Sequence, residues 1–173
     1  RCFAANGFHA TSMQDVFREA GLSAGAVYGY FSGKEEIIAA IALDAMSTVR
    51  GVLTEMVEGE PPPLGEALGR LALELQRLDE ERGVANMALQ AWGETLRNPT
   101  LADRAREMYA GVRDAMVKFV EAYQARGDID PDADPRDVAA VLISIAPGLF
   151  VQRAVFGGAN AEMFQRGLAA LCR

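Results

Sequence analysis

Apolar residues recur at helical spacing along nearly the whole chain, and no stretch alternates apolar and polar residues with the period of two that marks a strand. Glycine and proline stand between the periodic segments, where helices begin and end. The pattern therefore predicts an all-α fold. The predicted helices span residues 1–6, 12–20, 24–30, 34–57, 64–79, 83–97, 100–126, 135–157 and 160–172.

The lengths of these helices divide the chain into two regions. The helices before residue 33 are short, and short helices are stable only when they pack together. The later helices are long and suit a bundle. Gly59 to Pro63 contains three consecutive prolines and cannot continue a helix, so it is predicted to be a connection. We expect an N-terminal domain of residues 1–45 and a C-terminal domain of residues 46–173.

Residues 11–31 have the pattern of two short helices joined by a tight turn. Thr11 and Gln14 have the spacing of a capping box, which would begin the first of these helices. Gly21 can adopt the left-handed conformation that ends a helix, and Ser23 can cap the second helix. The second helix begins with small residues, which let its backbone approach a surface closely.

Residues 20–37, which read AGLSAGAVYGYFSGKEEI, resemble the signature of the TetR/AcrR family of repressors. Residues 3–12, FAANGFHATS, are similar to the end of the family's first helix and the start of its second. The resemblance covers about residues 3–43. It implies a three-helix DNA-binding domain with a helix-turn-helix, joined by a long helix to a C-terminal bundle that binds a ligand and forms a dimer.

The resemblance also implies which residues contact DNA. Two hydroxyl residues at a helix start would hold a phosphate, the start of residues 24–30 would enter the major groove, and two tyrosines and a lysine would contact phosphates. For Tyr28, packing in the core with a surface hydroxyl is an equal alternative. Ala24 and Gly29 stand where longer side chains are common, so direct readout of bases should be sparse and DNA shape important. The candidate residues are Thr11, Ser12, Ser23, Ala24, Gly25, Ala26, Tyr28, Gly29, Tyr30 and Lys34.

Charge counts against a strongly basic DNA-binding surface. The net charge of the chain is -7, and residues 1–46 hold three basic and five acidic residues. Phosphate neutralisation requires clustered Lys and Arg. DNA contact is therefore expected to depend on backbone amides, hydroxyls and helix N-termini, or on basic residues of a preceding segment, because the sequence starts without Met inside a predicted helix.

The predicted helices of residues 64–126 carry long apolar stripes, which by default form a core. Methionines, large aromatic residues and a few polar groups at facing positions favour a cavity instead. The family resemblance implies a pocket among the helices after residue 46, with a small apolar or aromatic effector. The candidate ligand contacts are Met56, Met87, Gln90, Trp92, Tyr109, Met116, Phe119 and Phe150.

The predicted helices 135–157 and 160–172 have more apolar positions than one small bundle covers. The resemblance implies that they pack against a second copy, giving a homodimer through residues 135–172. A kink is expected at Pro147 and Gly148. The two recognition helices would meet successive major grooves of a near-palindromic double-stranded DNA operator, about 34–36 Å apart. An effector that changes this spacing would release a repressor from its operator.

Other classes of function fit the sequence less well. A helical dimer that binds a small molecule or a partner, with weak or lost DNA binding, is the main alternative. An enzyme is not expected, because His9 is the sole histidine and no phosphate-binding glycine loop is present. Cys2, Cys172 and His9 lack zinc-site spacing, so reduced thiols, no metal and no cofactor are expected. No signal segment or uninterrupted apolar span of about 18 residues occurs, which predicts a cytoplasmic protein away from the membrane.

Overall fold

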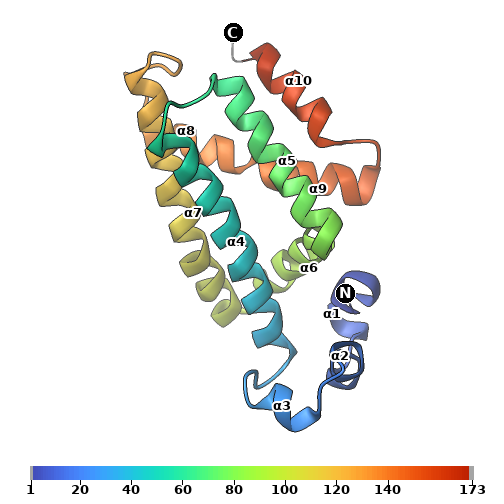
Figure 1. The fold of residues 1–173 in the computed structure, drawn as a ribbon. Helices are drawn as coiled ribbons and strands as arrows, with labels where there is room; N and C mark the ends of the chain where they lie inside the picture. The colour runs from blue at the N-terminus through green and yellow to red at the C-terminus, as the bar shows by residue number, and fades with distance from the viewer. Residues whose placement is uncertain (1, 172–173) are drawn as a thin grey trace.

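The structure is a computed structural model that describes residues 2–171, apart from the side chains of Ala4 and Phe8. All secondary structure in this part of the chain is helical, which confirms the all-α prediction (Figure 1). Cys172, the second predicted thiol and the last residue of the predicted dimer segment, lies outside the described residues.

Three short helices form the N-terminal unit: α1 (Cys2–Ala10), α2 (Met13–Ala20) and α3 (Ala24–Tyr28). A long helix, α4, leads from this unit into a larger bundle (Figure 1). The predicted boundary between residues 45 and 46 falls inside α4, which continues through it without a break, and this boundary stays a prediction. The bundle contains α4 (Lys34–Glu58), α5 (Leu64–Arg82), α6 (Val84–Thr95), α7 (Pro99–Ala125), α8 (Pro135–Ile143), α9 (Ile145–Val151), a π-helix η1 (Gln152–Phe156) and α10 (Ala161–Leu171).

Two predicted helices differ from the structure by more than a few residues. The first, predicted to end at residue 6, continues to Ala10 through a kink at Gly7, where φ is 80° and ψ is 171°. The predicted helix 135–157 is divided into α8, α9 and η1. Pro147 has no N–H, so the carbonyl of Ile143, four residues earlier, loses its helical donor and α8 ends there. The break thus lies one turn before the expected kink at Pro147 and Gly148.

The core of the bundle lies where α5 and α7 face α4, α9 and α10. Tyr123 is completely buried on α7, and its hydroxyl donates a hydrogen bond to the carbonyl of Pro62 at 2.7 Å. This bond fixes the triple-proline connection to the core. Along α5, Gly65 permits close packing of α10, because a β-carbon there would come within 2.9 Å of the Ala169 backbone.

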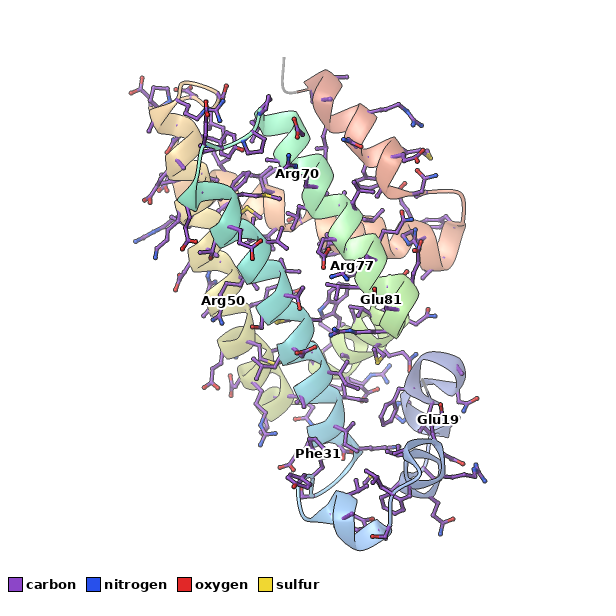
Figure 2. The ribbon with its side chains drawn as sticks, viewed as in Figure 1. Glu19, Phe31, Arg50, Arg70, Arg77 and Glu81 are labelled. Carbon is purple, nitrogen blue, oxygen red and sulfur yellow. The ribbon has the colours of Figure 1, made fainter. Side chains whose placement is uncertain are left out.

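The outer face of α5 carries charged side chains, among them Arg70, Arg77 and Glu81 (Figure 2). Arg77 pairs with Glu81 at 3.4 Å, one helical turn away. The opposite face of α5 is apolar and buried, with Leu68 and Leu75 in the core. The helix is therefore amphipathic and presents one face to the interior of the bundle.

Two helical segments, Lys34–Glu58 and Pro135–Phe156, are long and apolar enough to cross a membrane by length and composition alone. Both segments contain charged residues, so neither is an uninterrupted apolar span. In the fold, α4 packs along α7. The second segment leaves Val141, Val155 and Phe156 exposed, at 68, 62 and 76% of their surface. These exposed residues belong to the region predicted to contact a second copy.

Candidate functional site

The helix α2 begins at Ser12, one residue after the predicted start at Thr11. The Ser12 hydroxyl accepts a hydrogen bond from the Asp15 N–H at 3.2 Å, and the Ser12 N–H donates to the Asp15 carboxylate at 3.0 Å. This is a reciprocal capping box, and it replaces the predicted pair of Thr11 and Gln14. Because the Ser12 hydroxyl and N–H both donate to the carboxylate, the pKa of Asp15 lies below its usual value.

The turn between α2 and α3 has the predicted geometry. Gly21 is left-handed, with φ 65°, and ends α2. The Ser23 hydroxyl caps α3 by accepting a hydrogen bond from the Ala26 N–H at 3.2 Å. Val27 anchors α3 with only 6% of its surface exposed. The structure thus confirms a helix, a tight turn and a second helix whose first residues are exposed.

Seven of the candidate DNA-contacting residues lie together on the exposed surface of α3 and the turn after it: Ser23, Ala24, Gly25, Ala26, Tyr28, Gly29 and Tyr30. Tyr30 is 85% exposed. Tyr28 combines both interpretations, because its ring packs edge-on against Phe17 at 5.4 Å while 53% of the residue is exposed. Ser12 is also exposed, at the start of α2.

Thr11 and Lys34 have structural contacts that the sequence did not reveal. Thr11 is 1% exposed, and its hydroxyl lies 2.7 Å from the carbonyl of Gly7 and 3.2 Å from that of Cys2. The predicted phosphate contact of the Thr11 hydroxyl does not fit this burial, because the group joins α1 to the start of α2. The Nζ of Lys34 donates to the carbonyl of Thr11 at 3.3 Å, so Lys34 connects α4 to the same point.

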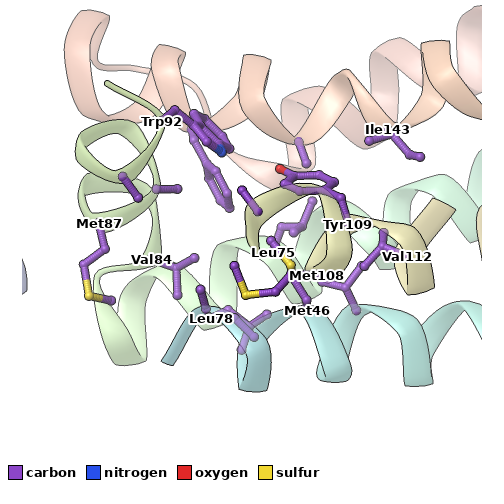
Figure 3. Close-up of a pocket in the computed structure, with 18 of the residues that line it drawn as sticks. Met46, Leu75, Leu78, Val84, Met87, Trp92, Met108, Tyr109, Val112 and Ile143 are labelled. Atoms are coloured by element: carbon purple, nitrogen blue, oxygen red, sulfur yellow. The ribbon is translucent and has the colours of Figure 1, made fainter. Parts of the chain in front are cut away.

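A cavity of about 200 Å³ lies among α4, α5, α6 and α7, with further walls from α1, α8, α9 and α10 (Figure 3). Its walls consist mainly of apolar side chains, including the methionines Met46, Met87 and Met108. An engineered apolar cavity of about 150 Å³ can hold benzene, so this one has room for a somewhat larger molecule. Six of the eight candidate ligand residues line it: Met87, Gln90, Trp92, Tyr109, Met116 and Phe150.

Met56 and Phe119, the other two candidates, do not line this cavity. They are 8 and 0% exposed and belong to the packed core. The Phe119 ring lies 4.5 Å from the ring of Tyr123, which is held by Pro62. Their apolar character serves packing near the triple-proline connection, so we do not retain them as ligand contacts.

Sequence reasoning missed two parts of the cavity wall. The first is α4, which contributes Ile38, Met46 and Val49. Their spacing is that of one helix face, a signal present in the sequence, but the one ligand contact predicted on α4 is Met56, which packs in the core. The second is Phe3 of α1, which is 4% exposed and lines the cavity. The N-terminal unit thus forms part of the cavity wall, which no local pattern indicates.

Most polar residues of the wall lie at the end of the cavity next to α1 and the start of α4. They are Glu35, Gln90, Glu94, Thr95 and Arg104. Glu94 of α6 pairs with His9 of α1, with 3.0 Å between Oε1 and Nε2. The wall helix α6 is therefore in direct polar contact with the N-terminal unit.

Tyr109 of α7 and Trp92 of α6 face each other across the apolar part of the cavity (Figure 3). Burial of Tyr109 raises its pKa above the usual value, whereas a hydrogen bond from Trp92 acts in the opposite direction. Among the described residues, no group of three or more His, Cys, Asp and Glu side chains could hold a metal ion.

Comparisons with known proteins agree along the whole chain. The family model of the tetR family of bacterial regulatory proteins matches residues 1–41, and that of the C-terminal domain of BetI-type transcriptional repressors matches residues 64–173. The chain is 24% identical over 170 residues to the HTH-type transcriptional regulator UidR of Escherichia coli K12, covering 98% of this chain and 84% of UidR.

Solved structures show the same fold. Salmonella enterica GusR superposes with a TM-score of 0.80 at 27% identity, over 99% of this chain and 87% of GusR. The transcriptional regulator FadR from Bacillus subtilis, solved in complex with stearoyl-CoA, has a TM-score of 0.81 at 17% identity, over 99% of this chain and 91% of FadR. At that identity the likeness to FadR concerns the fold alone.

Proposed function

The chain belongs to the tetR family of bacterial regulatory proteins, and we propose that it is a homodimeric repressor released from its operator by a small apolar or aromatic effector. It is a DNA-binding transcriptional regulator that responds to a ligand. The observation that carries the proposal is the apolar cavity, whose wall includes Phe3 from the DNA-binding unit. A molecule in this cavity would contact both units of the chain.

The proposed DNA interface is the exposed surface of α3 together with Ser12 and Lys34. The small residues at the start of α3 allow its backbone to approach the major groove closely. Tyr28 and Tyr30 offer hydroxyls to phosphates, and Lys34 offers its ammonium group at the edge of this surface. Few long side chains are available for reading bases, which supports recognition through phosphates and DNA shape.

The proposed dimer forms through residues 135–172. Regulators of this family are dimers, and α8, η1 and α10 carry apolar side chains exposed in the single chain. Phe156, Met163 and Leu171 are 76, 47 and 83% exposed. An isologous pairing of this face would cover them and fix the separation of the two α3 helices. We place the protein in the cytoplasm, where its operator lies.

The proposed coupling between effector and DNA has two physical routes. The first is α4, which carries cavity residues such as Ile38 and begins directly after the α3 region. The second is α6, which contacts α1 through the pair of Glu94 and His9. An effector that moves either helix would change the distance between the two α3 helices and so lower the affinity for the operator.

Selection of binding sequences from random duplex DNA tests the DNA-binding half of the proposal. The expected product is a near-palindromic sequence with half-sites about one helical turn apart. The variant Ala24→Glu, which places a carboxylate on the DNA side of α3, should abolish binding. If no duplex is enriched with the full chain, the alternative of a ligand-binding dimer without DNA affinity replaces the proposal.

Titration of apolar and aromatic ligands into the complex with the selected operator tests the effector half. A ligand that occupies the cavity should weaken operator binding, and the operator should weaken ligand binding by the same factor. Ala24→Glu should still bind the ligand, because α3 lies away from the cavity. Ligand binding with unchanged operator affinity would refute the release mechanism.

A further inference from the structure

The pair of Tyr109 and Trp92 places polar atoms within the apolar part of the cavity. Both side chains line the cavity, and the Tyr109 hydroxyl points toward the indole ring (Figure 3). Trp92 also acts to lower the pKa of Tyr109, against the rise that burial causes. Because the indole N–H can only donate, the phenolic oxygen is the acceptor between these two facing groups.

The Tyr109 hydroxyl has a proton that it can donate into the cavity. A phenol can donate one hydrogen bond and accept another. The Tyr109 oxygen faces the indole of Trp92, and among the described residues no hydrogen bond donated by the Tyr109 hydroxyl is found. A half-buried donor without an acceptor is costly in an apolar environment unless a ligand or water satisfies it.

Two polar wall residues of α6 that follow Trp92 in the sequence already have partners. The Thr95 hydroxyl donates to the carbonyl of Trp92 at 2.8 Å. Glu94 pairs with His9 at the end of the cavity beside α1. The Tyr109 hydroxyl thus offers a hydrogen-bond donor in the apolar region of the cavity.

We propose that the effector has a compact apolar or aromatic body with one hydrogen-bond acceptor, such as a ketone, ester or ether oxygen, and that the Tyr109 hydroxyl donates to this oxygen. Trp92 acts as a positioning residue, because its N–H holds the hydroxyl oxygen and so directs the proton into the cavity. This inference rests on the proposed function, since it names the class of effector for the same cavity. It predicts discrimination between molecules of equal shape that differ in one acceptor.

Acetophenone and α-methylstyrene form a suitable pair of probes, because a methylene group in the second replaces the carbonyl oxygen of the first. Trp92 is the only tryptophan of the chain, so its fluorescence reports occupation of the cavity. Calorimetry provides an independent value of each Kd. The measured quantity is the ratio of the two Kd values, which removes the contribution of the shared apolar body.

Tyr109→Phe should shift this ratio against the ketone by about three- to tenfold, the effect of one net hydrogen bond, and leave the Kd of α-methylstyrene nearly unchanged. Tyr30→Phe, which removes the same atom from the exposed DNA-binding surface, is the matched control and should leave the ratio at its wild-type value. An identical ratio in wild type and Tyr109→Phe would overturn the inference while the effector cavity stands.

A measurement on the wild type alone keeps the inference testable if Tyr109→Phe folds poorly. The infrared carbonyl stretch of bound ¹³C-labelled acetophenone should move to lower wavenumber than in hexane, because a donated hydrogen bond weakens the C=O bond. A hexane-like frequency for the bound ketone would overturn the inference. If neither probe occupies the cavity, the proposed apolar effector fails, and the assignment of Tyr109 fails with it.

Discussion

Gln90, on the wall of the cavity, lies directly against Gly7 in α1: a β-carbon at Gly7 would stand 3.0 Å from the Oε1 atom of Gln90. The carbonyl of Gly7 in turn accepts a hydrogen bond from the buried Thr11 hydroxyl at 2.7 Å. The carbonyl of Thr11 accepts one from Lys34. A continuous set of contacts therefore leads from the cavity wall through the kink of α1 to the start of α4.

Gly7→Ala should destabilise the protein by about 1–3 kcal/mol, because the backbone at φ 80° and ψ 171° is a conformation that residues with a β-carbon avoid. The new methyl group would also press on Gln90. Denaturant unfolding measures the change in the free energy of unfolding. Gly93→Ala in α6 is the control, since nothing lies within 4 Å of a β-carbon there, and it should be neutral or stabilising. Equal effects of the two substitutions would contradict the role of the kink.

Thr11→Val should cost about 1–3 kcal/mol of stability, because it removes a buried hydroxyl and leaves carbonyl groups of α1 without their donor. Thr11→Ser keeps the hydroxyl and should lose less stability than Thr11→Val. Since the hydroxyl is buried, the folded Thr11→Val variant should bind the operator with the same Kd as Thr11→Ser. A weaker operator affinity in the valine variant alone would restore the phosphate contact that the family resemblance implies.

Lys34→Met should weaken binding to all duplex sequences by a similar factor and lower the slope of log K against log salt by about 0.9 for each subunit, if Lys34 contacts a phosphate. Fluorescence anisotropy at several salt concentrations measures this slope. Lys118→Met, at an exposed position of α7 away from the proposed DNA interface, is the control and should leave it unchanged. An unaltered slope in Lys34→Met would refute the phosphate contact of Lys34.

Asp15 should make the stability of the protein depend on pH in the acidic range. Its folded pKa is lowered below 3.8 by the bonds from Ser12, so its carboxylate stabilises the fold above the unfolded pKa, and this contribution is lost as the pH falls through the folded pKa. Asp15→Asn should therefore be less stable than wild type at neutral pH, and the difference should shrink as the pH falls through the folded pKa of Asp15. The exposed Asp114→Asn on α7 controls for loss of one negative charge. A difference that persists at the lowest pH would exclude the charge of Asp15 as its cause.

Asp79 should be more important for stability than its place near a helix end suggests. Its carboxylate accepts a hydrogen bond from the Ala85 N–H at 2.9 Å and pairs with Arg153 at 3.1 Å, joining α5 to α6 and η1. Both side chains of the pair are less than one-fifth exposed. Asp79→Ala should cost about 2–3 kcal/mol in thermal or denaturant unfolding, because it removes the acceptor of the Ala85 N–H and leaves Arg153 with only the more exposed Glu80, 3.6 Å away.

The exposed pair of Arg166 and Glu162 on α10 provides the comparison for Asp79. Its atoms are 3.8 Å apart and its side chains are at least 70% exposed. Glu162→Ala should therefore change the free energy of unfolding by less than about 0.5 kcal/mol. Similar losses in Asp79→Ala and Glu162→Ala would show that the bonds of Asp79 contribute little.

Features with a local signal could be predicted from the sequence. Gly21 and Ser23 determine the turn between α2 and α3 through their own backbone and side-chain bonds, and both were correctly identified. The start of α2 was less certain, because Thr11 and Ser12 are both capping residues by type. Only the packing of α1 over Thr11 decides between them, and that contact joins separate helices.

The difference between local signals and contacts that join separate helices also explains which cavity residues the sequence predicts. Met116 and Phe119 are both apolar residues of α7, three positions apart, yet Met116 lines the cavity and Phe119 packs in the core. Residue type and helical period do not separate these two roles, because they depend on which neighbouring helices lie opposite. Phe3 could not be predicted for the same reason, since its place in the wall depends on how α1 docks beside α6.

The cavity also has a cost for the protein that carries it. At about 24 cal/mol for each Å³ of unfilled space, a cavity of about 200 Å³ corresponds to at most on the order of 5 kcal/mol of packing energy that the fold forgoes. This is a large part of the stability of an ordinary domain. A molecule that fills the space restores some of it, and unfolded chains become rarer in proportion. The abundance of the regulator should therefore rise with its effector, because proteases in the cell remove the empty form faster than the occupied one.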